Sequence, residues 1–106
     1  MERELMVGEA AQKLAAGVPM LDVREYPEFV AGHVDGAQLL PLSELKQNPE
    51  RCKHDGEVLV MCRSGRRAAE AAMLLSHRPG IQPIVVQGGM EAWQQAGLPV
   101  RTEKGP

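Results

Sequence analysis

Apolar residues fall in short blocks along the chain, and the spacing within each block indicates either a strand or a helix. Continuous apolar runs, typical of strands covered on both faces, predict strands over residues 5–7, 18–23, 37–40, 58–61 and 84–86. Helix-forming residues and one-sided apolar spacing predict helices over residues 8–16, 27–31, 44–47, 66–75 and 90–96. Strands that alternate with helices in this way predict an α/β sandwich with a mainly parallel sheet.

Turn-forming and capping residues mark the boundaries between these elements. Ser43 is expected to be the N-cap of the helix over residues 44–47, because a hydroxyl there accepts a free N–H of the first turn. Residues 48–56 are expected to form a loop, and residues 101–106 are expected to form a frayed tail.

Length and composition limit the class of protein. A chain of 106 residues is expected to form a single domain, 1–106, with its core at about residues 5–100. Hydrophobic residues make up 43% of the chain, but there is only one Trp, one Tyr and one Phe, so the core must consist of aliphatic side chains. A net charge of −2 gives no sign of a nucleic-acid partner.

The distribution of apolar residues and cysteines indicates where the protein works. No apolar run approaches the roughly 18 residues of a membrane span, so no membrane partner is expected. The first residues, Met1-Glu2-Arg3-Glu4, lack the apolar segment of a signal peptide. Two cysteines do not make a disulfide framework, so a reducing cytoplasm is the expected location.

The strand over residues 58–61 leads into a loop that carries the strongest chemical signal of the chain. Cys62 stands where the strand ends, and a helix begins near Arg66. Backbone N–H groups at a helix start lack partners within the helix and carry partial positive charge, so a loop over such a start binds anions. Arg63, Arg66 and Arg67 add three guanidinium groups. Such surroundings stabilise a thiolate, and Cys62 is therefore predicted to be a nucleophile in an anion-binding loop.

The two cysteines also have less specific interpretations. A cysteine after an apolar strand is often a small buried hydrophobe, but packing alone gives no reason to place three arginines beside it. Cys52 and His54 are too few to form a zinc site, so no metal is expected. Cys52 is expected to be a surface thiol without a role; the alternative is a resolving partner for Cys62.

Polar residues also stand at the carboxyl end of the strand over residues 18–23. Asp22 and Arg24 alternate along it and so share one side, which favours a structural ion pair or a hydrogen bond that closes the fold. The alternative is that Asp22 orients an arginine of the Cys62 loop. His33 follows Gly32 in a turn and is expected to stabilise that turn rather than to act as an acid or base.

Four stretches carry a resemblance to a known family. They are Leu21-Asp22-Val23-Arg24-Glu25, Gly32-His33-Val34-Asp35-Gly36-Ala37, Cys62-Arg63-Ser64-Gly65-Arg66-Arg67 and Gly88-Gly89-Met90-Glu91-Ala92-Trp93. In this order they resemble the motifs of the rhodanese (sulfurtransferase) family over about residues 5–100. The resemblance implies a rhodanese-like three-layer sandwich, in which a five-stranded, mainly parallel sheet has helices on both faces.

The resemblance also implies an activity and a set of site residues. It implies transfer of a sulfane sulfur from thiosulfate or a similar anionic donor to cyanide or a thiol, including a protein thiol, through a persulfide on Cys62. No cofactor is expected. Asp22 and Arg24 are expected to support the site. The residues expected to bind substrate are Arg63, Ser64, Gly65, Arg66 and Arg67.

Two alternative functions share a cysteine in such a loop. One is a non-catalytic sulfur-carrier or interaction module on the same fold. The other is a cysteine phosphatase or arsenate reductase, whose loops resemble Cys-x5-Arg. Cys62 to Arg67 is Cys-x4-Arg, and this shorter loop fits one added sulfur atom better than a tetrahedral phosphate.

Two orientations remain as predictions from sequence. Arg67 is expected to face the anion-binding loop and Arg66 is expected to face solvent. Gly88-Gly89 is expected to provide a turn and close backbone packing, the alternative being that it forms one rim of the substrate pocket.

Overall fold

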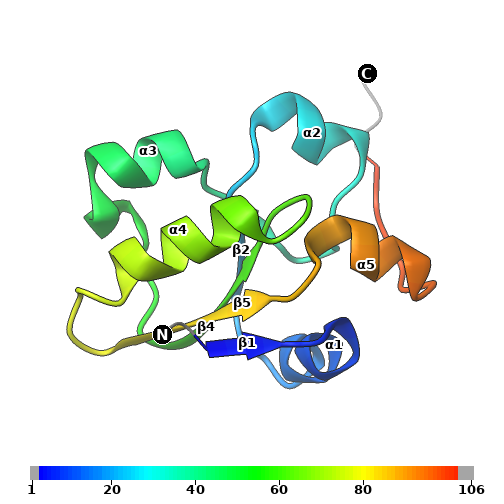
Figure 1. Ribbon diagram of the computed structural model, residues 1–106, viewed down its shortest axis with the longest axis horizontal. Helices are drawn as coiled ribbons and strands as arrows, with labels where there is room; N and C mark the ends of the chain where they lie inside the picture. The colour runs from blue at the N-terminus through cyan, green and yellow to red at the C-terminus, as the bar shows by residue number, and fades with distance from the viewer. Residues whose placement is uncertain (1–2, 103–106) are drawn as a thin grey trace.

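The computed structural model describes residues 3–102 and places a five-stranded sheet between layers of helices (Figure 1). This arrangement confirms the predicted α/β class and the implied rhodanese-like sandwich. In chain order the elements are β1 (Arg3–Leu5), α1 (Val7–Ala15), β2 (Met20–Asp22), α2 (Tyr26–Ala31), β3 (Gln38–Leu39), α3 (Leu42–Gln47), the 3₁₀ helix η1 (Pro49–Arg51), β4 (Gly56–Met61), α4 (Arg66–Leu75), β5 (Ile81–Val86) and α5 (Gly89–Gln95).

The strand order determines where a ligand can bind. The order is β1-β5-β4-β2-β3, and every pairing is parallel. From β2 the chain continues to β3 on one side, and from β4 it continues to β5 on the other. The carboxyl ends of β2 and β4 therefore flank the crevice where ligands bind in open parallel sheets. Asp22 pairs with Met61 at this point, so the residues after both strands meet at one edge.

Alternation along β4 divides the buried side chains between two cores. The α3/α4 core lies on one face and the α1/α5 core on the other. Val58 and Val60 of β4 point into the first, and Leu59 and Met61 point into the second. The α3/α4 core contains Leu21, Val23, Leu40, Leu42, Leu45, Cys52, Val58, Val60, Cys62, Ala68, Ala71, Ala72, Leu75, Ile81 and Val85. The α1/α5 core contains Ala10, Met20, Val34, Leu59, Met61, Ile84, Val86, Met90 and Trp93.

Several features of the first half of the chain differ from the predicted pattern. β2 and β3 are shorter than the predicted strands 18–23 and 37–40, and α3 begins before residue 44. The first strand ends at Leu5 rather than at Val7, because Met6 is already the N-cap residue of α1. The predicted loop over residues 48–56 contains η1, and β4 begins at its last residue, Gly56. These differences move element boundaries and add η1, and the order of the strands and α-helices is as predicted.

The predicted cap of the third helix is also wrong. Pro41 is the N-cap residue of α3, and Ser43 lies inside the first turn. The Ser43 hydroxyl donates a hydrogen bond to the Glu25 carboxylate at 3.4 Å instead of accepting one from a backbone N–H. Proline fits here because its fixed φ already suits the chain just before a helix.

The end of the chain is tied to the turn after α2. Backbone N–H and C=O groups of Arg101 and His33 form a pair of hydrogen bonds at 2.7 and 2.8 Å, so the predicted fraying does not begin at Arg101. The rest of that prediction, for residues 103–106, lies outside the described residues. Within residues 3–102, no helix is both long and apolar enough to cross a membrane.

Candidate active site

The loop between β4 and α4 surrounds the sulfur of Cys62 with backbone N–H groups. The N–H of Gly65 donates to the Cys62 Sγ at 3.0 Å, and the N–H of Ala68 donates at 3.3 Å. Gly65 is the N-cap residue of α4 and has a φ of 106°, a left-handed conformation that glycine adopts without strain. The loop thus turns back on itself and directs the positive end of α4 at the thiol. Two N–H donors that converge on one atom at a helix start form an anion-binding arrangement.

A second glycine turn, Gly88-Gly89, packs against the backbone of the same loop. The N–H groups of Met90 and Glu91, at the start of α5, donate to the carbonyls of Cys62 and Arg63 at 2.8 and 3.0 Å. A Cβ at Gly89 would lie 2.4 Å from the Cys62 carbonyl oxygen, so no other residue fits without displacing the loop. The predicted role of the Gly88-Gly89 turn in close backbone packing is confirmed.

Asp22 and Arg24 form a buried ion pair at the end of β2. The Arg24 guanidinium contacts the Asp22 carboxylate through Nε at 2.9 and 3.1 Å and through a terminal nitrogen at 2.7 Å. Arg24 also donates to the backbone carbonyls of Glu28 and Gly32. The structural interpretation of this pair is confirmed. Asp22 makes these hydrogen bonds with Arg24 and not with an arginine of the Cys62 loop.

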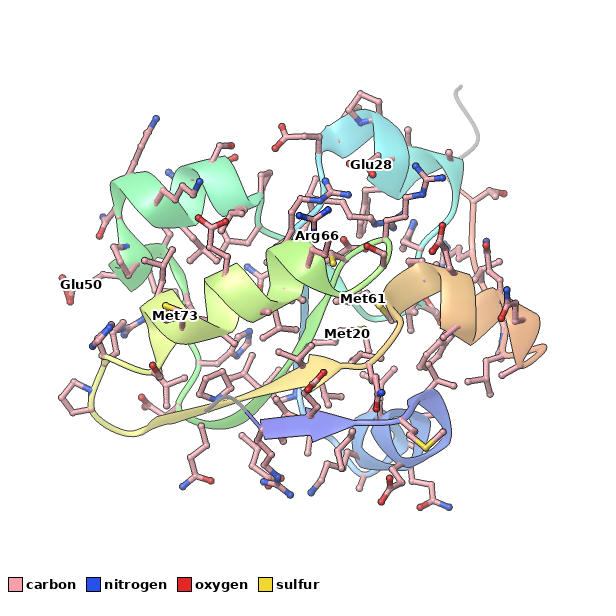
Figure 2. All side chains as sticks on the ribbon, viewed as in Figure 1. Met20, Glu28, Glu50, Met61, Arg66 and Met73 are labelled. Atoms are coloured by element: carbon pink, nitrogen blue, oxygen red, sulfur yellow. The ribbon has the colours of Figure 1, made fainter. Side chains whose placement is uncertain are left out.

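The arginines of the Cys62 loop have different partners. Arg67 makes two parallel hydrogen bonds to the Glu28 carboxylate of α2, at 2.7 and 2.9 Å. Arg63 makes one longer contact of 3.3 Å with Glu91, between side chains that are mostly exposed. Arg66 is exposed and has no carboxylate partner within residues 3–102. Figure 2 shows Arg66 on the first turn of α4 and Glu28 on α2.

The Glu28–Arg67 pair shifts the pKa of both side chains. The Arg67 guanidinium lowers the pKa of Glu28 to about 2, from an ordinary value of 4.5, although partial burial opposes the shift. The Glu28 carboxylate in turn raises the pKa of Arg67, with smaller contributions from Cys62 and Asp22. Glu28 therefore stays ionised at any pH well above 2, and Arg67 stays protonated.

Two hollows open beside the Cys62 loop, and we call them together the mouth of the site. One has a volume of about 390 Å³ and the other about 430 Å³. The first is lined by Arg24, Glu28, Arg63, Met90, Glu91 and Gln94. The second is lined by Ser64, Arg66, Arg67 and Glu70. Of the predicted site residues, Arg24 and Arg63 line the first hollow, and Ser64, Arg66 and Arg67 line the second. Asp22, Cys62 and Gly65 line neither of them.

Sequence reasoning missed the acidic residues of the mouth. One feature of the sequence could have indicated that Glu28 lies at the site: it stands four residues after Arg24, in a short helix that follows a strand end. Glu91 lies in the Gly-Gly motif but was not singled out. The sequence positions of Glu28 and Glu91 do not show which arginine each carboxylate contacts.

Cys52 and His33 lie outside the mouth. Cys52 is fully buried in the α3/α4 core, so the expected surface position is wrong. His33 is buried, stacks on the Phe29 ring with centroids 3.9 Å apart, and its Nδ1 lies 2.9 Å from the Phe29 carbonyl oxygen. The turn-stabilising interpretation of His33 is confirmed. Within residues 3–102, no group of three or more His, Cys, Asp or Glu side chains could hold a metal ion.

Comparison with known proteins supports this picture of the fold. Residues 6–96 match the family model described as the rhodanese-like domain. A crystal structure of a rhodanese-related protein from Thermoplasma volcanium is 31% identical, with a TM-score of 0.86 over 95% of this chain and 99% of that one.

Named relatives include both sulfurtransferases and sulfur carriers. The thiosulfate sulfurtransferase GlpE of Vibrio cholerae is 33% identical over 81 residues, which is 76% of each chain. A candidate sulfur carrier protein of Bacillus subtilis, YrkF, is 32% identical over 70% of this chain and 40% of its own length. The chain spans only about half the length of several curated relatives, between 40% and 59%.

Proposed function

The chain belongs to the rhodanese-like domain family, and we propose that it is a sulfurtransferase that acts through a persulfide on Cys62. One observation carries the proposal: the Cys62 Sγ lies at the start of α4 and accepts hydrogen bonds from two backbone N–H groups. The proposed donor is thiosulfate or a similar sulfane compound. The proposed acceptor is cyanide or a thiol, including a protein thiol.

The first half-reaction loads one sulfur atom onto Cys62. The thiolate attacks the outer sulfur of thiosulfate and forms a new S–S bond. The bond between the two sulfur atoms of thiosulfate breaks, and sulfite leaves with the electron pair. The product is a Cys62 persulfide with its negative charge on the terminal sulfur. No oxidant or reductant is needed. The thiolate supplies the electron pair of the new S–S bond, and sulfite leaves with the electron pair of the bond that breaks.

Backbone N–H groups of the loop are proposed to hold the terminal sulfur. The N–H groups of Ser64, Arg66 and Arg67 have no protein acceptor within residues 3–102. Fixed donors of this kind stabilise developing negative charge without having to reorganise during the reaction. The Arg63 and Arg66 side chains are proposed to attract the anionic donor, and Gly65 allows the turn. The buried Asp22–Arg24 pair is proposed to hold one wall of the mouth in place.

The second half-reaction returns the enzyme to its starting state. Cyanide or a thiolate attacks the terminal sulfur, the S–S bond breaks, and the Cys62 thiolate leaves. Thiocyanate forms from cyanide, and a persulfide forms from a thiol. Both cysteines of the chain are free thiols, which suits the reducing cytoplasm that we propose as the location.

A sulfur carrier without turnover is the second candidate function. The similarity to the YrkF protein favours it, since that relative is 32% identical over 74 residues. In a carrier the persulfide forms but is passed only to a specific protein. The two candidates therefore differ in the second half-reaction and agree in the first.

Intact mass spectrometry of the whole chain tests both halves of the proposal. After incubation with thiosulfate we expect the mass to increase by one sulfur atom, and after cyanide we expect it to return to its starting value. A persulfide that neither cyanide nor small thiols discharge would indicate the carrier. A chain that gains no sulfur from any sulfane donor would contradict both functions.

A further inference from the structure

The bidentate contact between Glu28 and Arg67 places a carboxylate at the mouth of a site that is predicted to bind anions. The two side chains lie 2.7 and 2.9 Å apart, and each is about one third exposed. Parallel hydrogen bonds of this geometry are the strongest that a guanidinium makes with a carboxylate. Arg67 therefore directs one edge of its guanidinium at Glu28, and that edge is not available to a substrate.

The other charged groups of the mouth are also balanced. The second hollow includes Glu70, but Lys46 neutralises it at 2.8 Å from outside the mouth. The remaining charges at the two hollows are those of four arginines, Arg24, Arg63, Arg66 and Arg67, and two carboxylates, Glu28 and Glu91. The buried Asp22 carboxylate, which pairs with Arg24, and the thiolate of Cys62 lie next to them. Four positive and four negative charges leave the reactive form of the site with no net formal charge.

This balance has a consequence for the choice of donor. A dianion such as thiosulfate gains from an excess of positive charge, and a site without that excess gives it little long-range attraction. The Glu28 carboxylate, which lines the first hollow, also repels it. A donor with one negative charge is repelled less, and a neutral donor is not repelled.

We propose that Glu28 is a specificity-determining residue that directs this site toward sulfane donors of low charge, organic thiosulfonates and persulfides, and away from the thiosulfate dianion. The inference rests on the proposed sulfurtransferase function and adds to it the class of donor. Glu28 acts on the donor both by its own charge and by holding the Arg67 guanidinium. It is not a catalytic residue, because it does not contact the Cys62 sulfur.

The methanethiosulfonate anion is a matched probe for this inference. The Cys62 thiolate attacks its terminal sulfur, the S–S bond breaks, and methanesulfinate leaves with the electron pair. The transferred atom and the new persulfide are the same as with thiosulfate. The two donors differ in one negative charge and in a methyl group that replaces one oxygen.

The variant Glu28→Gln separates charge from shape. Glutamine is nearly isosteric, and its amide oxygen can still accept the hydrogen bond that the Glu25 N–H donates to Glu28. The measurement is kcat/KM for each donor with cyanide as acceptor. We expect the ratio of thiosulfate to methanethiosulfonate to increase about fivefold in the variant, because one unit of charge a few ångströms from a partly exposed site has an effect of that order.

Glu91→Gln is the matched control. Glu91 also faces a loop arginine across the mouth, but the Arg63 and Glu91 side chains are 70% and 53% exposed. Water and salt screen charges at such positions, so the same ratio should change by less than about twofold. An equal change in both variants would indicate a general effect of net charge and would overturn a specific role for Glu28.

The dependence on salt tests the inference without any variant. For the wild-type chain, kcat/KM for thiosulfate should change by less than about twofold between low and high ionic strength, because the mouth attracts the dianion weakly. In Glu28→Gln it should decrease with salt. A steep decrease in the wild-type chain would overturn the inference even if the variant failed to fold.

Failure of the inference and failure of the proposed function give different results. If Cys62 gains no sulfur from either donor, the proposed function is wrong. If both donors load Cys62 and the ratio stays the same in a Glu28→Gln variant of unchanged Tm, only the inference is wrong. A purely structural contact would change Tm and leave the donor ratio and the salt dependence as they are.

Discussion

The two cysteines of this chain have almost the same burial and entirely different surroundings. Cys52 is 0% exposed and Cys62 is 1% exposed, both are free thiols, and both belong to the α3/α4 core. Burial therefore does not distinguish them. The difference lies in what the backbone presents to each sulfur.

Backbone N–H groups donate to the Cys62 sulfur, whereas the hydrogen bonds next to Cys52 involve backbone carbonyls and not its sulfur. The Cys62 sulfur accepts from the N–H groups of Gly65 and Ala68. Near Cys52, the Arg78 guanidinium donates to the carbonyls of Pro49 and Cys52, and no donor to the Cys52 sulfur is present within residues 3–102. The proposed reactivity of Cys62 depends on the start of α4 that surrounds its sulfur, whereas Cys52 has only the surroundings of a packing residue.

The strongest test of this contrast is Cys62→Ser. Serine is close in size and keeps the hydrogen-bonding position but is a poor nucleophile toward sulfane sulfur. We expect sulfur transfer to cyanide to be abolished, with a loss greater than about 1000-fold, and the far-UV circular dichroism spectrum to stay the same. Clear residual turnover in the purified variant would show that Cys62 is not the nucleophile.

Gly89→Ala tests whether the loop needs its support from α5. The added Cβ would lie 2.4 and 2.6 Å from the carbonyl oxygens of Cys62 and Arg63, at a φ of 58°. We expect unfolding free energy to decrease by about 2–5 kcal/mol and turnover to decrease at least tenfold. Urea unfolding and the cyanide assay measure the two effects.

Gly97→Ala is the matched control for Gly89→Ala. Gly97 also has a positive φ, 73°, but a Cβ there meets nothing within 4 Å. It should cost only about 1–2 kcal/mol of stability and leave turnover unchanged. Equal losses of turnover in the two variants would mean that backbone strain, and not displacement of the Cys62 loop, explains the effect.

Cys52→Ser should affect stability and not chemistry. A hydroxyl at this fully buried position lacks a partner and should decrease the unfolding free energy by about 1–3 kcal/mol. We expect kcat/KM to be unchanged and thiosulfate-derived sulfur to appear only on the peptide that contains Cys62. Loss of turnover after the first sulfur would instead identify Cys52 as a resolving thiol.

The smallest expected effect concerns acid stability near the Cys62 loop. The pKa of Glu28 is lowered to about 2, so the stability it contributes is complete above pH 4.5 and is lost as pH falls through about 2. Glu28→Gln should lose less stability than the wild-type chain over that interval, by less than about 1 kcal/mol because the pair is partly exposed. Thermal unfolding at several pH values measures it, and parallel curves would exclude a contribution from the pair.

Most of the fold was predictable because its signals are local. Apolar runs and helix-forming segments identified every strand and α-helix in order, and the strand-to-helix turn at Gly65 located the candidate nucleophile. The N-cap of α3 was not predictable in this way. Serine is generally preferred at N-cap positions, but α3 begins directly after Pro41, so Ser43 lies inside its first turn. Cys52 was misplaced because a short polar neighbourhood in sequence does not reveal that η1 folds its cysteine inward.

The sequence by itself determined the order of the elements, the position of Cys62 and the three arginines beside it. Only the tertiary structure decided which carboxylates form ion pairs with those arginines. Glu28 lies 39 residues from Arg67, and Glu91 lies 28 residues from Arg63. Such pairs depend on how α2 and α5 pack over the carboxyl ends of the strands, and no local pattern specifies that packing. The charge of the mouth, and with it the proposed choice of donor, is therefore a property of the folded chain.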